Sequence, residues 1–121
     1  MAIDSPLLIE RLHGSLPGTV ILRLTGPFTL STVLPLRAQF RDFEPSRLTI
    51  LDLTGVSFLD SAGMSELINY EVYCRDKRVS FMIAGVSPRV LGVLQITRLD
   101  KVRTLVPTVE DAEARAKAVR I

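Results

Sequence analysis

The stretch Leu51–Leu67, which reads LDLTGVSFLDSAGMSEL, decides the fold. Its first residues complete an apolar run that begins at Arg47, and such a run is typical of a strand buried within a sheet. A polar loop follows, and Asp60 then stands where a helix N-cap is expected, because its carboxylate can accept hydrogen bonds from the first turn. The stretch therefore predicts three elements in order: a strand over 47–53, a connection over 54–59 and a helix from Asp60-Ser61 to about Lys77.

The predicted helix has two faces of different character. Apolar residues at helical spacing should face the core, and these are Met64, Leu67, Ile68 and Val72. Another face carries residues four positions apart, namely Ser61, Ser65, Asn69 and Tyr73. Ala62 and Gly63 keep the first turn small, so another chain could approach it closely.

The chain before this stretch is expected to open with an antiparallel hairpin. Pro6–Leu12 and Thr19–Thr25 have the composition of strands, and the second is rich in β-branched residues. Between them, His13–Gly18 holds two glycines and a proline in six residues, which is turn chemistry. After Gly26-Pro27 we expect a helix from Ser31 or Thr32 to about Phe43, with Leu36, Phe40 and Phe43 facing the core.

The remaining sequence predicts two further strand–helix units. They are a strand over Val79–Ala84, a helix from Ser87-Pro88 to about Thr97 with Val90, Leu91 and Leu94 inward, a strand over Val102–Val106 and a helix capped by Thr108. The fold class is therefore α/β: a single-domain mixed β-sheet with an N-terminal hairpin, then βα units whose helices pack on the sheet. One domain is expected over residues 1–121, with its core at about 6–115.

Composition narrows the classes of function. Cys74 is the only cysteine and His13 the only histidine, so an internal disulfide or a Cys/His zinc site lacks its residues. The formal net charge is +2, and no Lys/Arg cluster with interleaved aromatics suggests nucleic-acid binding. No apolar run reaches the roughly 18–20 residues that span a bilayer, and no signal peptide is visible, so we expect a cytoplasmic protein without membrane insertion. No P-loop occurs, and we expect no cofactor.

Asp60-Ser61 before a helix is, taken alone, ordinary capping chemistry. The longer pattern Phe58–Gly63 (FLDSAG), however, resembles the signature of the STAS domain, named for sulfate transporters and anti-sigma factor antagonists. Arg23–Gly26 (RLTG) and Gly85–Val90 (GVSPRV) match two further motifs of this family in the same order. The resemblance covers about residues 6–115.

The resemblance is to stand-alone bacterial anti-sigma factor antagonists, and it implies that Ser61 is a phospho-acceptor. The unphosphorylated form would bind an anti-sigma factor, commonly also a serine kinase, and so release a sigma factor. Phosphorylation would switch binding off, and a phosphatase would reset the protein, which would not itself be an enzyme. The expected partner surface consists of Asp60, Ser61, Ala62, Gly63, Ser65 and Asn69, with the loops around Phe28 and Ser87.

One segment departs from the family pattern. Antagonists of this kind usually carry an acidic, polar stretch after the Leu-Thr-Gly strand, whereas this chain has Gly26–Leu30 (GPFTL) without an acid. That stretch normally lies near the phosphorylation site, so its apolar character leaves the identity of the partner open. It could support a partner contact or a homodimer.

Two other interpretations start from single residues. Asp52, at the end of a central strand, could be the phospho-acceptor of a response-regulator receiver domain, but the chain has no acidic pair after its first strand and no Lys-Pro turn. Ser61 could be a hydrolase nucleophile, but its base would have to be His13, and no Gly-x-Ser-x-Gly elbow surrounds the serine. Asp52 is more simply a hydrogen-bond acceptor for the loop that follows it.

A third alternative keeps the fold. Other stand-alone STAS proteins act in stressosome scaffolds or as accessory subunits of lipid transporters, where phosphorylation is not obligatory. In either case Cys74 is expected to pack a helix, and Tyr70 and Tyr73 are expected to be surface or partner contacts.

Overall fold

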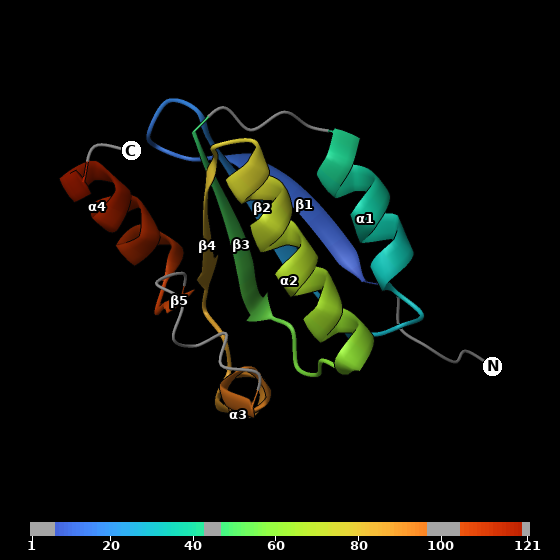
Figure 1. The fold of residues 1–121 in the computed structure, drawn as a ribbon. Coiled ribbons are helices and arrows are strands. Elements are labelled where there is room, and N and C mark those ends of the chain that lie inside the picture. The colour runs from blue at the N-terminus through green and yellow to red at the C-terminus, as the bar shows by residue number, and fades with distance from the viewer. Residues whose placement is uncertain (1–6, 43–46, 97–104, 120–121) are drawn as a thin grey trace.

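The computed structural model describes residues 7–42, 47–96 and 105–119. Strands and helices alternate along this part of the chain after an initial hairpin (Figure 1). The elements are β1 (Leu8–His13), β2 (Thr19–Thr25), α1 (Val33–Asp42), β3 (Leu48–Gly55), α2 (Ser61–Asp76), β4 (Ser80–Ala84), α3 (Pro88–Ile96), β5 (Leu105–Val106) and α4 (Val109–Val119).

The strands form one mixed sheet of five in the order β1-β2-β3-β4-β5. β1 runs antiparallel to β2, and every later neighbour is parallel. The central register aligns Ile21 with Ile50 and Ile50 with Met82. The predicted mixed α/β sheet with an opening hairpin is confirmed.

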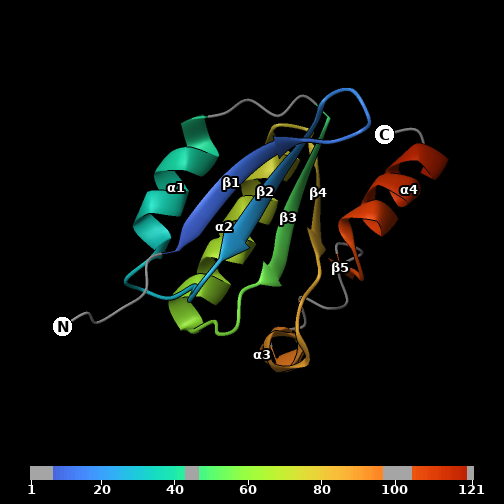
Figure 2. The same ribbon diagram turned by 180° about the vertical axis from the view of Figure 1, so that it is seen from behind.

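Helices cover both faces of this sheet. In Figure 1, α1 and α2 lie in front of the strands, and in Figure 2, which is turned by 180°, the strands lie in front of α2. Leu22, Leu51 and Ile83 share one core cluster with Leu67 of α2. The alternate residues on the other face pack against α4, and this second cluster contains Ile21, Ile50, Met82, Ala112 and Ala116.

Most element boundaries agree with the sequence prediction, with two differences. β1 includes His13, which we expected in the turn, because His13 pairs with Val20, and β3 is longer than predicted. β3 continues through Gly55, because Thr25 pairs with Gly55 after a register shift and the N–H of Gly26 donates to the Gly55 carbonyl at 3.0 Å. The 54–55 segment predicted as a connection is therefore strand. The structure does not describe the side chain of Phe40, nor Phe43 and residues 102–104. The predictions for these residues therefore lie outside the described part of the chain.

The predicted apolar stripe of α2 is wrong in part. Met64 and Leu67 are buried, but Ile68 and Val72 are 40% and 41% exposed. The buried face also contains Gly63, Glu66, Tyr70 and Cys74. Tyr70, at 3% exposure, is therefore not the surface contact that we expected, whereas Cys74 packs the helix as predicted.

A charged pair explains why an acidic residue belongs to this buried face. Glu66 of α2 is 2% exposed, and its carboxylate pairs with the Arg37 guanidinium of α1 through Nε–Oε2 at 3.3 Å and an additional Nη2–Oε1 contact. The hydrogen bond and the negative charge of Glu66 raise the pKa of Arg37. A buried carboxylate needs such a partner, and this one joins α1 to α2.

Candidate functional site

Ser61 lies where the end of β3 leads into α2. It is the first residue of the helix and is exposed. Asp60 is the N-cap, as predicted: its backbone is extended, and its Oδ1 accepts a hydrogen bond from the N–H of Gly63 at 2.9 Å. The first amides of a helix lack intrahelical acceptors, so this end suits negative charge.

The loop after β2 lies beside the loop that leads into α2. The N–H of Phe28 donates to the Phe58 carbonyl at 3.0 Å, and the N–H of Asp60 donates to the Phe28 carbonyl at 3.3 Å. Phe28 and Leu59 form a parallel bridge. Asp60 adds a side-chain link, because its Oδ2 accepts from the N–H of Leu30 at 3.1 Å.

Two expected partner contacts at this junction have another role. The Phe28 side chain is fully buried and belongs to the core, so it cannot reach a partner. Gly63 is also buried, and a Cβ there would overlap the carbonyl oxygen of Phe28. Gly63 therefore allows close approach of the chain's own loop, not of another chain. Leu30 and Phe58, at 73% and 47% exposure, are apolar side chains that this junction presents to solvent. Leu30 belongs to the apolar Gly26–Leu30 segment for which a partner contact or a homodimer was left open, whereas Phe58 was not among the expected partner contacts.

The predicted polar face of α2 is exposed along most of its length. Ser61, Ser65 and Asn69 are exposed, and Tyr73 is half-buried with the Lys77 ammonium 5.7 Å from its ring centroid. Ala62 is half-buried. Ser61 therefore starts a polar strip on the outer side of the helix.

Ser87 lies at the same end of the sheet as Ser61, where β3 and β4 end. β3 and β4 are parallel neighbours, so the segments that follow them leave the sheet at one edge. The Ser87 hydroxyl oxygen accepts from the N–H of Val90 at 3.2 Å and caps α3, as predicted. This hydroxyl is half-buried and engaged, so the loop contributes to a surface through its shape more than through this group.

Asp52 belongs to the structural framework. Its Oδ1 accepts from the N–H and the hydroxyl of Thr54 at 3.0 and 2.6 Å, and its Oδ2 accepts from Arg23 Nε at 3.2 Å. Asp52 is a hydrogen-bond acceptor as predicted, but its partner Thr54 belongs to the end of β3 and not to the loop that we expected. A receiver domain is excluded as the fold, because the doubly wound receiver order is 2-1-3-4-5 and parallel, whereas β1 here pairs antiparallel with β2 at the sheet edge.

The hydrolase interpretation fails on the position of its base. His13 ends β1 and pairs with Val20 near the start of β2. It therefore lies at the end of the sheet where β2 and β3 begin, whereas the β3–α2 junction lies at the end where β3 stops. Ser61 Oγ therefore has no imidazole within reach for activation. Among the residues that the structure describes, no three His, Cys, Asp or Glu side chains gather closely enough to hold a metal ion.

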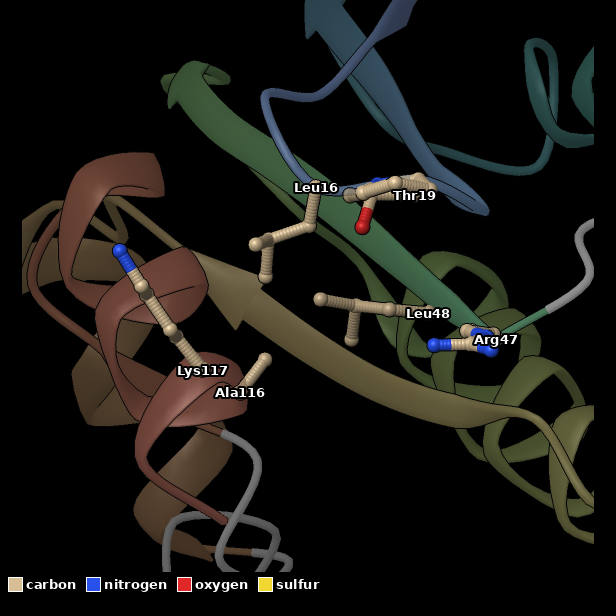
Figure 3. Close-up of a pocket in the computed structure, with 7 residues that line it drawn as sticks. Leu16, Thr19, Arg47, Leu48, Ala116 and Lys117 are labelled. Carbon is tan, nitrogen blue, oxygen red and sulfur yellow. The ribbon is translucent and has the colours of Figure 1, made fainter. Parts of the chain in front are cut away.

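A pocket of about 180 Å³ also lies far from Ser61. It is at the edge where β2 and β3 begin, next to Thr19 and Leu48. Figure 3 shows Leu48 and Ala116 pointing toward its centre, with Arg47 and Lys117 on opposite sides. This pocket is therefore separate from the β3–α2 junction.

Comparison with known proteins identifies a family and finds two kinds of similar protein, which are solute carrier or sulfate transporter family proteins and anti-sigma factor antagonists. The family model for the STAS domain matches residues 14–112. Solute carrier family 26 member 10 of Mus musculus is 31% identical over 129 aligned residues, which cover 92% of this chain but 18% of the mouse protein. The chain therefore spans less than a fifth of the length of that relative.

Solved structures of both kinds share the fold. An anti-sigma factor antagonist from Mycobacterium paratuberculosis is 25% identical with a TM-score of 0.75, covering 95% of this chain and 99% of that one. The Bacillus cell fate determinant SpoIIAA in its phosphorylated form is 21% identical with a TM-score of 0.69, covering 91% and 98%. A sulfate transporter family protein from Wolinella succinogenes is 23% identical with a TM-score of 0.76, covering 85% and 88%. In the described ranges of this chain, no helix is both long and apolar enough to cross a bilayer.

Proposed function

The chain belongs to the STAS domain family, and from that premise we propose that it is an anti-sigma factor antagonist controlled by phosphorylation of Ser61. The unphosphorylated form binds an anti-sigma factor and so releases a sigma factor. The anti-sigma factor acts as the serine kinase, and a separate phosphatase restores the binding form. In this proposal the chain is a single cytoplasmic STAS domain that works by binding and not by catalysis.

The observation that carries the proposal is the exposure of Ser61 at the first residue of α2. A kinase can reach this hydroxyl without unfolding the chain. Phosphorylation adds about −1.5 to −2 charge at neutral pH, and a helix N-terminus tolerates that charge because of its dipole. The fold should therefore survive while the surface changes.

The same charge would oppose a protein partner at this surface. A docked partner would desolvate the phosphate, and the phosphate would repel acidic side chains at the contact, the neighbouring Asp60 among them. The surface that we propose comprises Asp60, Ser61, Ala62, Ser65 and Asn69, flanked by the Ser87 loop and by the exposed Leu30 and Phe58. Exposed apolar side chains beside a polar strip are compatible with a protein interface, which combines apolar and polar contacts.

The test uses purified anti-sigma factors of the source organism and three forms of the chain. These are the unmodified protein, Ser61→Ala, and protein with phosphoserine at position 61 made by co-translational incorporation. We expect the first two to bind one anti-sigma factor equally and the phosphoserine form to bind at least about tenfold more weakly in calorimetry. The variant Gln39→Glu, with one added charge at an exposed position of α1, should bind like the unmodified chain. Equal binding by all forms would contradict the switch.

A second candidate function rests on the likeness to solute carrier family 26 member 10. In that case the domain would bind a membrane transport protein and act as its regulatory part. Cross-linking in membranes of the source cells distinguishes the two. Capture of a transport protein by both the Ser61→Ala and the phosphoserine forms, without capture of an anti-sigma factor, would favour this second function.

A further inference from the structure

The Asp60 carboxylate holds two segments at once. Oδ1 accepts from the N–H of Gly63 at 2.9 Å within the first turn of α2, and Oδ2 accepts from the N–H of Leu30 at 3.1 Å in the loop after β2. The two bonds join residues 33 positions apart in sequence through one side chain. A capping residue needs only the first of these bonds.

The loop that receives the second bond is otherwise held by bonds within itself and at its base. The N–H groups of Thr32 and Val33 donate to the Thr29 carbonyl at 2.9 and 3.0 Å. The Thr32 hydroxyl donates to the Pro27 carbonyl at 2.8 Å and accepts from the N–H of Thr29 at 2.9 Å. Phe28 is held by its buried ring and by its backbone bond to Phe58. Leu30 lies at the exposed tip, with 73% of its surface in solvent. The Asp60 carboxylate is thus the link between this tip and α2.

We propose that Asp60 is a positioning residue that couples the phosphorylation state of Ser61 to the placement of Leu30. This inference rests on the proposed function, since it concerns the same serine. A phosphate on Ser61 would lie next to the Asp60 carboxylate in the sequence and at the same helix end. Both anions would compete for the few free amides of the first turn, and they would repel each other. The phosphate then takes the place of the Asp60 carboxylate at these amides, and the carboxylate turns away from the helix end. Its bond to the Leu30 amide is lost with that movement, and the tip of the loop is released from α2.

The consequence is that phosphorylation changes shape as well as charge at the partner surface. The Leu30 side chain is apolar and exposed, and it is carried by the loop that borders Phe58. Its release removes an ordered apolar contact from the surface that a partner would cover. Phe28, by contrast, keeps its backbone bond to the Phe58 carbonyl, so the base of the loop stays in place.

A single substitution separates the two roles of Asp60. Asparagine is as good an N-cap as aspartate, because one carbonyl oxygen is enough to accept from the Gly63 amide. The asparagine NH₂ group cannot accept a hydrogen bond, so Asp60→Asn should keep the cap and lose the bond to Leu30. This variant reproduces the released loop without a phosphate.

The test is amide hydrogen exchange by NMR on the full chain without any partner. Forms compared are unmodified, Asp60→Asn, phosphoserine at 61 and phosphoserine at 65, which carries the same charge one turn further along the exposed face. We expect the Leu30 amide to exchange about tenfold faster in Asp60→Asn and in phosphoserine-61, the size expected for one lost bond to a charged acceptor in a surface loop. The Phe28 amide should keep its rate in all forms, the Gly63 amide should keep its rate in Asp60→Asn, and phosphoserine at 65 should leave Leu30 unchanged.

The proposal is overturned if the Leu30 amide exchanges at the same rate in the unmodified and phosphoserine-61 forms. It is also overturned if Asp60→Asn leaves that rate unchanged while the Gly63 amide stays protected. These outcomes are independent of the proposed function. Loss of anti-sigma factor binding by phosphoserine-61 with an unmoved Leu30 would reject the coupling alone, and release of Leu30 with unchanged binding would reject the switch alone.

Discussion

Gly63 packs directly against the backbone of Phe28, so that a Cβ at position 63 would overlap the Phe28 carbonyl oxygen. The contact joins α2 to the loop after β2 at the point where Ser61 is presented. Gly63→Ala should lower the free energy of unfolding by about 1–3 kcal/mol, because a backbone atom cannot move aside as the end of a side chain can. Chemical denaturation measures the change.

The matched control is Gly92→Ala in α3. A Cβ at Gly92 would meet nothing within 4 Å. Gly92 lies in the middle of α3, where alanine is the better helix former, so Gly92→Ala should raise the free energy of unfolding by about 0.5–1 kcal/mol. If Gly63→Ala also stabilised the chain, the close approach of α2 to the loop would be refuted.

The Arg37–Glu66 pair should matter more to stability than an exposed pair on the same helix. Arg37→Gln leaves the buried Glu66 carboxylate without its charged partner, so the free energy of unfolding should fall. The comparison is Arg75→Gln, which removes the i,i+4 ion pair between Arg75 and Glu71. The Arg75 side chain of this pair is 69% exposed. Such pairs contribute about 0.3–0.5 kcal/mol. Denaturation curves in which Arg75→Gln costs as much as Arg37→Gln would argue against a structural role for the buried pair.

Cys74 should make stability depend on alkaline pH. Burial raises the pKa of its thiol from 9.0 to about 11. The folded-state pKa exceeds the unfolded one, so the folded state binds the proton more tightly. The stabilisation is therefore complete below about pH 9 and is lost as the pH rises toward 11.

The measurement is the free energy of unfolding of the wild type and of Cys74→Ala between pH 7 and pH 11. The other titrating groups are common to both proteins, so their difference isolates the thiol. The difference should change only above about pH 9, in the direction that disfavours the wild type. Curves that stay parallel up to pH 11 would show that the thiol titrates as it does in the unfolded chain.

Local sequence chemistry predicted the features that depend on short-range interactions. Thr19–Thr25 was predicted with its observed bounds, and Asp60, Ser87 and Thr108 all cap helices as expected. A capping side chain bonds an amide three residues further along, so its sequence signature contains the whole interaction.

The errors lie where distant segments decide the outcome. Ile68 and Val72 are exposed although they are apolar, whereas Glu66 is buried because Arg37 of another helix neutralises it. Phe28 is buried because its loop folds back on the β3–α2 junction, which no local pattern in the loop reveals. The Leu30–Asp60 bond was missed for the same reason.

The central claim, that Ser61 is a phosphorylation switch, is tested most directly by intact-mass analysis of the protein purified from its own cells, with peptide mapping of residues 47–75. We predict one phosphate, located on Ser61, that is absent from a Ser61→Ala variant expressed in the same cells. A chain that carries no phosphate under any growth condition, yet remains stably bound to a partner protein, would contradict the account.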